Sequence, residues 1–362
     1  MPKRLALVMI VRDEARCIER CLASARPWVD QMIVLDTGSS DDTVARARRA
    51  GAWVHHFSWV DDFSAARNAA LDLCDADWRL VLDADEWITS GAECLAALGR
   101  TDTGFIGQIQ VTSGFGSAGA AGRGAAESPT WLPRVLPRGV RYSGRIHEQP
   151  DVAMPRRRLG LVVGHDGYLD EHLQAKAGRN ERLLRRALAE QPDDPYLHYQ
   201  LAKDLELRGG FAAALPLYER AHADSPAHAA WRHDLVLRLI FSLKKLGRFA
   251  QAMLLVEREL PHWPRSPDFF FTLGDLLLDW AASEPARGPA LLPMIESAWL
   301  QALTIGENPD LHDTVRGRGS FLAAHNLAVL HMSLGHAEQA QAWRARERQL
   351  RAALLEPQAA TA

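Results

Sequence analysis

The chain has 362 residues, and at roughly 150 residues per domain this length predicts two domains rather than one core. Hydrophobic residues make up 47% and charged residues 24%, a composition that is typical of a globular, water-soluble protein. The net charge of −3 argues against general polyanion binding, so nucleic acid is not an expected partner.

Neither the apolar segments nor the cysteines indicate a membrane or secreted protein. No apolar stretch approaches the roughly 20 residues of a membrane-spanning helix, so the sequence predicts no transmembrane segment. The four cysteines (Cys17, Cys21, Cys74, Cys94) include no C-x-x-C pair, which is typical of reduced thiols and does not indicate zinc. We therefore expect a cytoplasmic protein, with any membrane association peripheral and at the inner face.

The first hundred residues alternate between short β-rich runs and amphipathic segments, which is the pattern of βαβ units. The predicted strands are Leu5–Val11, Gln31–Leu35, Trp53–His56 and Trp78–Leu82. This pattern predicts an α/β N-terminal domain with a mostly parallel, Rossmann-like sheet. Ligands of such sheets bind at the carboxyl ends of the strands.

The next segment, Thr112–Ser128, is rich in Gly, Ala and Ser and is predicted to be a mobile loop. Further strands are expected at Trp131–Leu136, Val140–Ser143 and Leu159–Gly164. The sequence becomes helical from Leu169, so we expect the first domain to cover residues 1–170, followed by a linking helix at residues 171–194.

Residues 195–355 repeat a pattern of small residues, aromatic residues, glycine and proline. The first copy consists of Leu201, Ala202, Gly209, Phe211, Ala214, Tyr218, Ala221 and Pro226, which are spaced as in a tetratricopeptide unit. Related copies follow, and an insertion is expected where Pro285, Gly288 and Pro289 interrupt the third one. The sequence therefore predicts a second, all-α domain of three to four helical hairpins.

The most informative motif is Asp83-Ala84-Asp85, which directly follows the predicted strand Trp78–Leu82. Acids at a strand end face solvent, a basic group or a hard cation, because burying a carboxylate without a partner is costly. A divalent metal that also binds a diphosphate fits this cluster. The alternative is that Asp83 and Asp85 only cap a helix that begins near Thr89.

Two further segments have related features. Asp36 directly follows the second predicted strand and precedes the turn at Gly38, and an acid here could hold a ribose or base edge. Ser40 or Asp41 could cap the next helix, but capping would not explain Asp36. Arg67 lies on a predicted helix and suits diphosphate oxygens. Its alternative role is a structural salt bridge to Asp36 or Asp83.

Four motifs together resemble the family 2 glycosyltransferases with a GT-A fold, over roughly residues 4–170. They are VMIVRDE at Val8–Glu14, VLDTGSSDDT at Val34–Thr43, DDFSAARNAAL at Asp61–Leu71 and LVLDADE at Leu80–Glu86. The family usually has asparagine where this chain has Asp13, a departure that leaves the acids in place.

The resemblance implies a nucleotide-diphosphate sugar donor, a UDP-sugar before others, and a manganese or magnesium ion. Asp36 would lie near the nucleoside, Asp83 and Asp85 would surround the metal, and Asp85 would bind it directly. A late histidine often completes the metal ligands of related enzymes, and His165 is the candidate here. The residues expected at the nucleotide sugar are Val11, Asp13, Glu14, Asp36, Gly38, Arg67, Asp83 and Ala84.

A base is also needed for the acceptor, and His147 and Glu148 are adjacent candidates after a predicted strand. Neighbours in an extended chain face opposite ways, so one of them at most should face the sugar, with Glu148 preferred. Each could instead be structural. Lys176 and Arg179 lie three residues apart on the following helix and could reach phosphate, although basic helix faces are usually solvated.

The sequence thus predicts a metal-dependent, inverting glycosyltransferase of the hexosyltransferase class with a glycan, lipid-linked or peptide acceptor. The helical repeats could bind a protein partner or form a dimer contact. Two alternatives belong to other classes: a catalytically silent helical-repeat scaffold and a metal-dependent nucleotidyltransferase.

Overall fold

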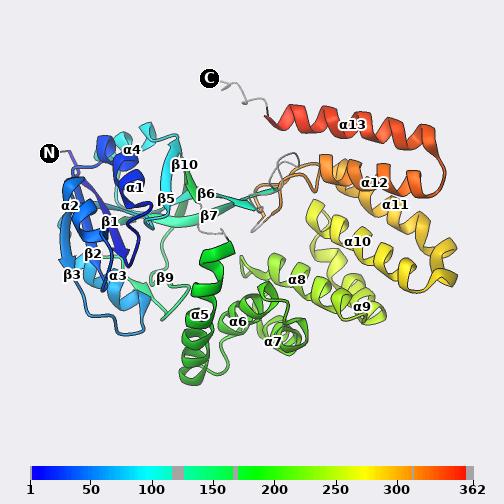
Figure 1. Cartoon of the computed structure of the whole chain (residues 1–362), viewed down its shortest axis with the longest axis horizontal. Helices are drawn as coiled ribbons and strands as arrows, with labels where there is room; N and C mark the ends of the chain where they lie inside the picture. The colour runs from blue at the N-terminus through cyan, green and yellow to red at the C-terminus, as the bar shows by residue number, and fades with distance from the viewer. Residues whose placement is uncertain (1, 116–125, 166–169, 312–313, 356–362) are drawn as a thin grey trace. The chain divides into compact units, whose positions relative to one another are not determined.

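The computed structural model describes residues 2–115, 126–165, 170–311 and 314–355 (Figure 1). The chain divides into two compact units, Met1–Asp193 and Asp194–Ala362. The first unit is α/β and the second is helical, which confirms the expected fold classes. The helix expected at residues 171–194 is α5 (Asp170–Glu190) and belongs to the first unit.

The first unit contains an eight-stranded sheet with the order β3-β2-β1-β4-β7-β6-β10-β5. Strands β3, β2, β1 and β4 are parallel to one another, whereas β7 is antiparallel to both of its neighbours, and β10 is parallel to β6 and antiparallel to β5. The strands are β1 (Leu5–Val11), β2 (Gln31–Asp36), β3 (Trp53–His56), β4 (Trp78–Val81), β5 (Glu86–Ser90), β6 (Ile106–Phe115), β7 (Ala126–Pro137) and β10 (Arg156–His165). A separate ribbon pairs β8 (Tyr142–Ser143) with β9 (Gln149–Pro150).

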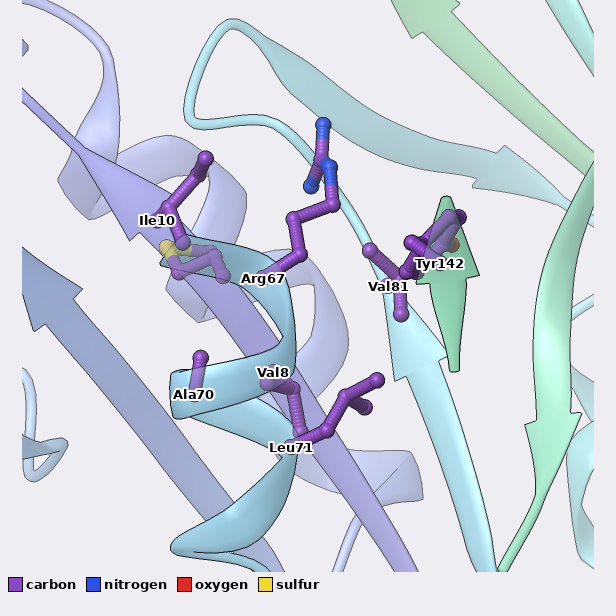
Figure 2. Close-up of a pocket in the computed structure, with 8 residues that line it drawn as sticks. Val8, Ile10, Arg67, Ala70, Leu71, Val81 and Tyr142 are labelled. Carbon is purple, nitrogen blue, oxygen red and sulfur yellow. The ribbon is translucent and has the colours of Figure 1, made fainter. Parts of the chain in front are cut away.

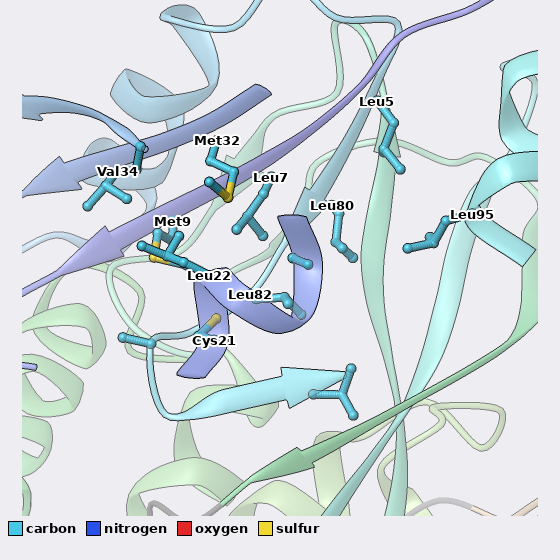
Figure 3. Packing of buried hydrophobic residues seen from close by; sticks show 14 of the residues in the cluster. Leu5, Leu7, Met9, Cys21, Leu22, Met32, Val34, Leu80, Leu82 and Leu95 are labelled. Atoms are coloured by element: carbon cyan, nitrogen blue, oxygen red, sulfur yellow. The ribbon is translucent and has the colours of Figure 1, made fainter. Parts of the chain in front are cut away.

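Apolar clusters cover both faces of the parallel part of this sheet because successive residues of β1 point to opposite sides. Leu7 and Met9 pack with Leu22 of α1 on one face (Figure 3), and Val8 packs with Ala70 of α3 on the other. The helices of this unit are α1 (Ile18–Ala25), α2 (Thr43–Arg49), α3 (Phe63–Asp72), α4 (Glu93–Ala97) and α5, with short 3-10 turns at Arg26–Trp28 and Leu98–Arg100.

The residues after the acidic motif form the strand β5, so the prediction of a helix that begins near Thr89 was wrong. β5 pairs with β10, and a β-bulge at Thr89 separates the pairs Val162–Ser90 and Val163–Ile88. The chain then turns at Gly91 (φ +73°), where a Cβ atom would lie 1.8 Å from the carbonyl oxygen of Gly160. This close approach of two backbones requires glycine, and the helix α4 starts only after it.

Two other sequence expectations in this unit also differ from the structure. The segment expected as a loop, Thr112–Ser128, begins and ends inside strands, because β6 extends to Phe115 and β7 starts at Ala126. The rest of that segment lies outside the described residues. Val140–Ser143 is a strand only at Tyr142 and Ser143.

The second unit consists of helices that pack as antiparallel hairpins, as the tetratricopeptide pattern predicts. Ala202, Ala214 and Tyr218 are buried between the first two helices, and Gly209 adopts φ +78° in the turn between them. The helices are α6 (Pro195–Leu207), α7 (Phe211–Asp224), α8 (Arg232–Lys245), α9 (Phe249–Glu259), α10 (Pro267–Ser283), α11 (Gly288–Ile305), α12 (Phe321–Ser333) and α13 (Ala337–Leu355), with 3-10 turns at Leu260–His262 and Pro285–Arg287.

The insertion predicted at Pro285–Pro289 was wrong. Pro285 starts a 3-10 turn and Pro289 lies in the first turn of α11, a position where proline is tolerated because its missing N–H has no helical partner. The long connection lies instead between Ile305 and Phe321. Within the described ranges, no helix is long and apolar enough to cross a membrane.

Candidate functional site

The candidate site lies at the carboxyl ends of β1, β2 and β4. The strand order reverses between β1 and β4, since β2 and β3 lie on one side of β1 and the remaining strands lie beyond β4. Such a reversal leaves a crevice in which open α/β sheets bind ligands. The loops that follow these three strands carry the acids identified from the sequence.

Asp36, at the end of β2, is buried and shapes its own turn. Its carboxylate accepts hydrogen bonds from the backbone N–H groups of Gly38 (3.3 Å) and Ser39 (3.1 Å), and Nδ1 of His56 lies 3.3 Å from it. Gly38 has φ +108°, a conformation that favours glycine. Asp36 does not cap α2, whose N-cap residue is Asp42, and its carboxylate instead fixes the turn after β2.

The loops after β1 and β2 are fastened to each other. Asp13 accepts hydrogen bonds from the N–H (2.7 Å) and hydroxyl (3.0 Å) of Ser40, and its own N–H donates to Ser39. The N–H of Glu14 donates to the hydroxyl of Thr43 (2.7 Å), and the Val11 carbonyl accepts from Thr37. Asp13 has φ +55°, which asparagine and aspartate adopt more readily than other side chains, so either residue suits this position.

Asp83 lies between two arginines. Nη2 of Arg67 donates to its Oδ1 (2.7 Å) and Nη2 of Arg134 donates to its Oδ2 (2.8 Å). Burial acts to raise the pKa of Asp83, but the charges of Arg134 and Arg67 outweigh burial and hold the pKa well below its usual range. The alternative considered for Arg67, a salt bridge to Asp83, is present.

Glu86, which had no assigned role, is the second carboxylate that holds Arg134. Its Oε1 accepts from Arg134 (2.9 Å), and its Oε2 accepts from the backbone N–H of Asp83 (2.9 Å). Glu86 is 2% exposed, and burial raises its pKa. Arg134 was missed from the sequence because it lies inside β7, in the segment Trp131–Pro137, which contains no acid or glycine that would indicate a site.

Asp85 and His165 lie together, although 80 residues separate them in the chain. The distance from His165 Nε2 to Asp85 Oδ2 is 3.4 Å, and both side chains are largely buried. The pairing of β10 with β5 places His165 opposite Glu86 and so beside the acidic motif. Burial acts to lower the pKa of His165, but the neighbouring Asp85 carboxylate outweighs burial and raises it.

The two candidate bases lie in a turn between β8 and β9 rather than in extended chain. Glu148 is 11% exposed at its side chain and pairs with Nε of Arg67, whereas His147 is exposed and has φ +53°. Glu148 thus joins the Arg67–Asp83 pair, and His147 does not.

An apolar crevice lies beneath Arg67, between α3 and the sheet, and it is too small to hold a water molecule (Figure 2). Val8 and Val81 line it from the strands, and Tyr142 closes one side. Asn68 holds Tyr142 in place through two hydrogen bonds of 2.9 Å with its backbone N–H and carbonyl. Within the described residues, Nη1 of Arg67 and the hydroxyl of Tyr142 are buried without a hydrogen-bond partner.

Replacing Tyr142 with phenylalanine is expected to leave stability at pH 7 unchanged or to raise it by up to about 1 kcal/mol, because a buried hydroxyl without a partner is removed. Burial raises the pKa of Tyr142 to about 12 from 10.0. Below pH 10 the neutral Tyr142 side chain therefore makes its full contribution to the free energy of unfolding. This contribution, on the order of 3 kcal/mol, is lost as the pH rises toward 12.

Denaturant unfolding at pH 7 and between pH 10 and 12 measures both effects. The Tyr142→Phe variant should lose less stability than the parent in alkali. Tyr199→Phe is the matched control, because the Tyr199 hydroxyl donates to Asp234 (2.5 Å) and its removal should cost about 1–2 kcal/mol at pH 7. A loss of that size in Tyr142→Phe would show that the Tyr142 hydroxyl has a partner in solution.

The side chains at this edge fit a divalent cation in part. Asp85 supplies a carboxylate and His165 an imidazole, and magnesium sites commonly use one or two carboxylates together with substrate phosphates. Both carboxylate oxygens of Asp83, the third expected ligand, are bonded to arginines. Over the part of the chain that the structure describes, no three His, Cys, Asp or Glu side chains form a metal-binding group.

Residues 6–142 match the family described as glycosyl transferase family 2. The N-terminal unit is a family 2 glycosyltransferase domain. Tetratricopeptide-type repeats follow this domain in the second unit. The chain is 34% identical over 259 residues to a TPR repeat-containing protein of Synechococcus elongatus, an alignment that covers 67% of this chain and 62% of that protein.

A second relative is the SPbeta prophage-derived glycosyltransferase SunS of Bacillus subtilis, 24% identical over 282 residues, which cover 75% of this chain and 66% of SunS. The chain thus spans less than two thirds of the length of either relative. A solved structure of glucosyl-3-phosphoglycerate synthase from Mycobacterium tuberculosis, in complex with Mn²⁺, UDP and glucosyl-3-phosphoglycerate, is 24% identical to this chain where the two align. The alignment covers 31% of this chain and 44% of the synthase chain, with a TM-score of 0.26.

Proposed function

We propose that the protein is a metal-dependent, inverting glycosyltransferase of the hexosyltransferase class. It would move a sugar from a nucleotide-diphosphate sugar, a UDP-sugar before others, to a glycan, lipid-linked or peptide acceptor. The observation that carries this proposal is the Asp85–His165 pair, 3.4 Å apart, in a family 2 glycosyltransferase domain. Asp85 shares its acidic motif with Asp83, and this motif follows β4, beside which the sheet order reverses.

Asp85 and His165 would hold a manganese or magnesium ion, which would neutralise charge that develops on the leaving diphosphate. Asp83 would act through its two arginines rather than as a bare anion, since Arg67 and Arg134 already bind both of its oxygens. Arg67 would thereby lie close to the donor's phosphates. Asp36, with the turn at Gly38 and the fastened loop of Val11, Asp13 and Glu14, would border the nucleoside.

Glu148 is the proposed base, with His147 as the second candidate. Its carboxylate is held by Arg67, which also contacts Asp83 at the acidic motif, so the base would lie beside the donor. A single displacement with one base inverts the anomeric carbon, and this is why inversion is proposed. The helical repeats would bind a protein partner, an acceptor or a second copy.

The test is product analysis with the full chain. Purified protein is incubated with a panel of nucleotide sugars and Mn²⁺, and release of nucleoside diphosphate is followed with and without a chelator. Release that requires metal supports glycosyl transfer or donor hydrolysis. Release of pyrophosphate from nucleoside triphosphates would indicate nucleotidyl transfer instead. Absence of any turnover, with peptides bound by the repeats, would favour the silent scaffold.

A further inference from the structure

We propose that Arg145 is a positioning residue, which holds the turn that carries Glu148 against α3. The proposal rests on the proposed function, because it concerns the position of the proposed base. Arg145 lies three residues before Glu148, between β8 and β9. Its side chain contacts the cap of α3 and the end of α5, two elements of the glycosyltransferase domain that are distant in the sequence.

The guanidinium of Arg145 joins the ends of these two helices. Its Nε and Nη2 donate to the two carboxylate oxygens of Glu190, the last residue of α5, at 2.8 and 2.7 Å. Its Nη1 lies 3.6 Å from the carboxylate of Asp62, the N-cap residue of α3. A two-point contact between a guanidinium and a carboxylate fixes orientation as well as distance, because both groups are planar.

The backbone of Arg145 is bonded to α3 as well. Its carbonyl accepts a hydrogen bond of 2.8 Å from the N–H of Phe63, the first residue of α3. This N–H has no partner inside the helix, because the first N–H groups of any α-helix lack one. Asp62 caps the same helix end by accepting from the N–H of Ala65 (2.9 Å). The start of α3 therefore depends on Arg145 for one of its hydrogen bonds.

Glu148 contacts the same helix about one turn further along. Its Oε1 accepts from Nε of Arg67, which lies four residues after Phe63 on α3. Four residues of an α-helix span roughly 6 Å. Arg145 and Glu148 thus anchor the turn at two successive points along α3.

The residue directly before the second anchor has a strained backbone. His147 has φ +53°, a left-handed conformation that residues other than glycine adopt at a cost. Such a conformation persists where the surrounding contacts determine it. His147 is exposed, whereas Ile146 is buried and Arg145 and Glu148 hold the chain on either side. Loss of the Arg145 contacts removes one of these restraints, so we expect the turn to relax and Glu148 to move relative to Arg67.

A displaced base affects the chemical step more than it affects donor binding. A base acts within hydrogen-bond reach of the proton that it takes, about 2.6–3.2 Å between heavy atoms. A displacement of about 1 Å can lower the rate about 100-fold. Among the described residues, the side chain of Arg145 pairs with Glu190 and Asp62 and with none of the acids of the acidic motif. Its loss should therefore leave donor binding unchanged.

Steady-state kinetics of the full chain test this assignment, with Mn²⁺ and the nucleotide sugar that the parent chain uses. Arg145→Gln should lower kcat about 10- to 100-fold and leave KM for the nucleotide sugar unchanged. Arg145→Lys, which keeps the charge but not the two-point contact, should lie between the two. Glu190→Gln, which leaves the turn itself intact, should also lower kcat, and it should add nothing further to Arg145→Gln.

Arg141→Gln is the matched control, because Arg141 directly precedes β8 and pairs with Asp72, the last residue of α3, at 2.7 Å. It should retain the kcat of the parent. Hydrogen exchange at the Phe63 amide provides a second readout that needs no turnover. Exchange there should be faster in Arg145→Gln than in the parent and unchanged in Arg141→Gln.

The Arg145 and Glu190 variants should fold, because Glu190 is 48% exposed and ion pairs so exposed contribute little to stability. An unchanged kcat in Arg145→Gln and Glu190→Gln would overturn the assignment. A raised KM with unchanged kcat would also overturn it, because Arg145 would then act in donor binding. A parent chain without turnover would overturn the proposed function, and equal Phe63 exchange in the parent and Arg145→Gln would separately show that Arg145 does not hold the turn.

Discussion

Replacing Asp85 with alanine is expected to reduce metal-dependent release of nucleoside diphosphate by about 100-fold or more. Loss of a residue that merely orients a metal ligand costs about 10- to 100-fold, and loss of a ligand itself should cost at least as much. Asp85 is 5% exposed and lies 3.4 Å from His165, so its removal leaves the imidazole as the sole member of the proposed metal pair.

Two measurements separate this effect from misfolding. Mn²⁺ should raise the unfolding temperature of the parent, because a ligand bound by the folded state stabilises that state, and it should not raise that of Asp85→Ala. Asp72→Ala is the matched control, since Asp72 is an exposed carboxylate paired with Arg141 and should retain turnover. Full turnover by Asp85→Ala would contradict the metal assignment.

Replacing Arg134 with methionine is expected to destabilise the glycosyltransferase domain by about 3–5 kcal/mol. Removing one member of a buried ion pair leaves the other charge without compensation. Arg134 is 12% exposed at its side chain and contacts both Asp83 and Glu86, and Glu86 is buried. The loss therefore affects two carboxylates at once, although Asp83 keeps Arg67.

Denaturant unfolding of three variants tests this expectation. Adding Glu86→Gln to Arg134→Met should restore part of the lost stability, because the second charge is then removed too. Arg138→Met is the control on the same chain segment, because Arg138 is exposed and its Nη1 lies 3.4 Å from the Asp75 carbonyl. Its loss should change the free energy of unfolding by at most about 0.5 kcal/mol. A similarly small change in Arg134→Met would show that the buried pair contributes little.

The sequence predicts the parts of this protein in which neighbouring residues determine the structure. The strands β1 to β3 follow from short apolar runs bounded by turns, and the helical hairpins follow from small and aromatic residues at fixed intervals. Asp83, Asp85 and Arg67 are identified because acids directly after a strand, or a basic residue on an amphipathic helix, are conspicuous in a local pattern.

The remainder depends on contacts between distant residues, which a local pattern does not contain. Arg134 reaches Asp83 across 51 residues, and only the folded sheet brings β7 beside β4. The segment after Asp85 is a strand because β10 offers it a partner, whereas its own sequence also suited a helix start. Glu148 is placed at Arg67 by a turn whose positive φ angle at His147 was not anticipated.

The β-bulge at Thr89 has a consequence for how this domain can vary in length. Side chains alternate between the two faces of a sheet, so one additional residue in a regular strand sends every later side chain to the wrong face. In β5 the additional residue is absorbed at Thr89, and His165 still lies opposite Glu86. The number of residues in β5 beyond Ile88 therefore does not set the geometry of the Asp85–His165 pair, and β5 could lose the additional residue without turning the histidine away from the acids.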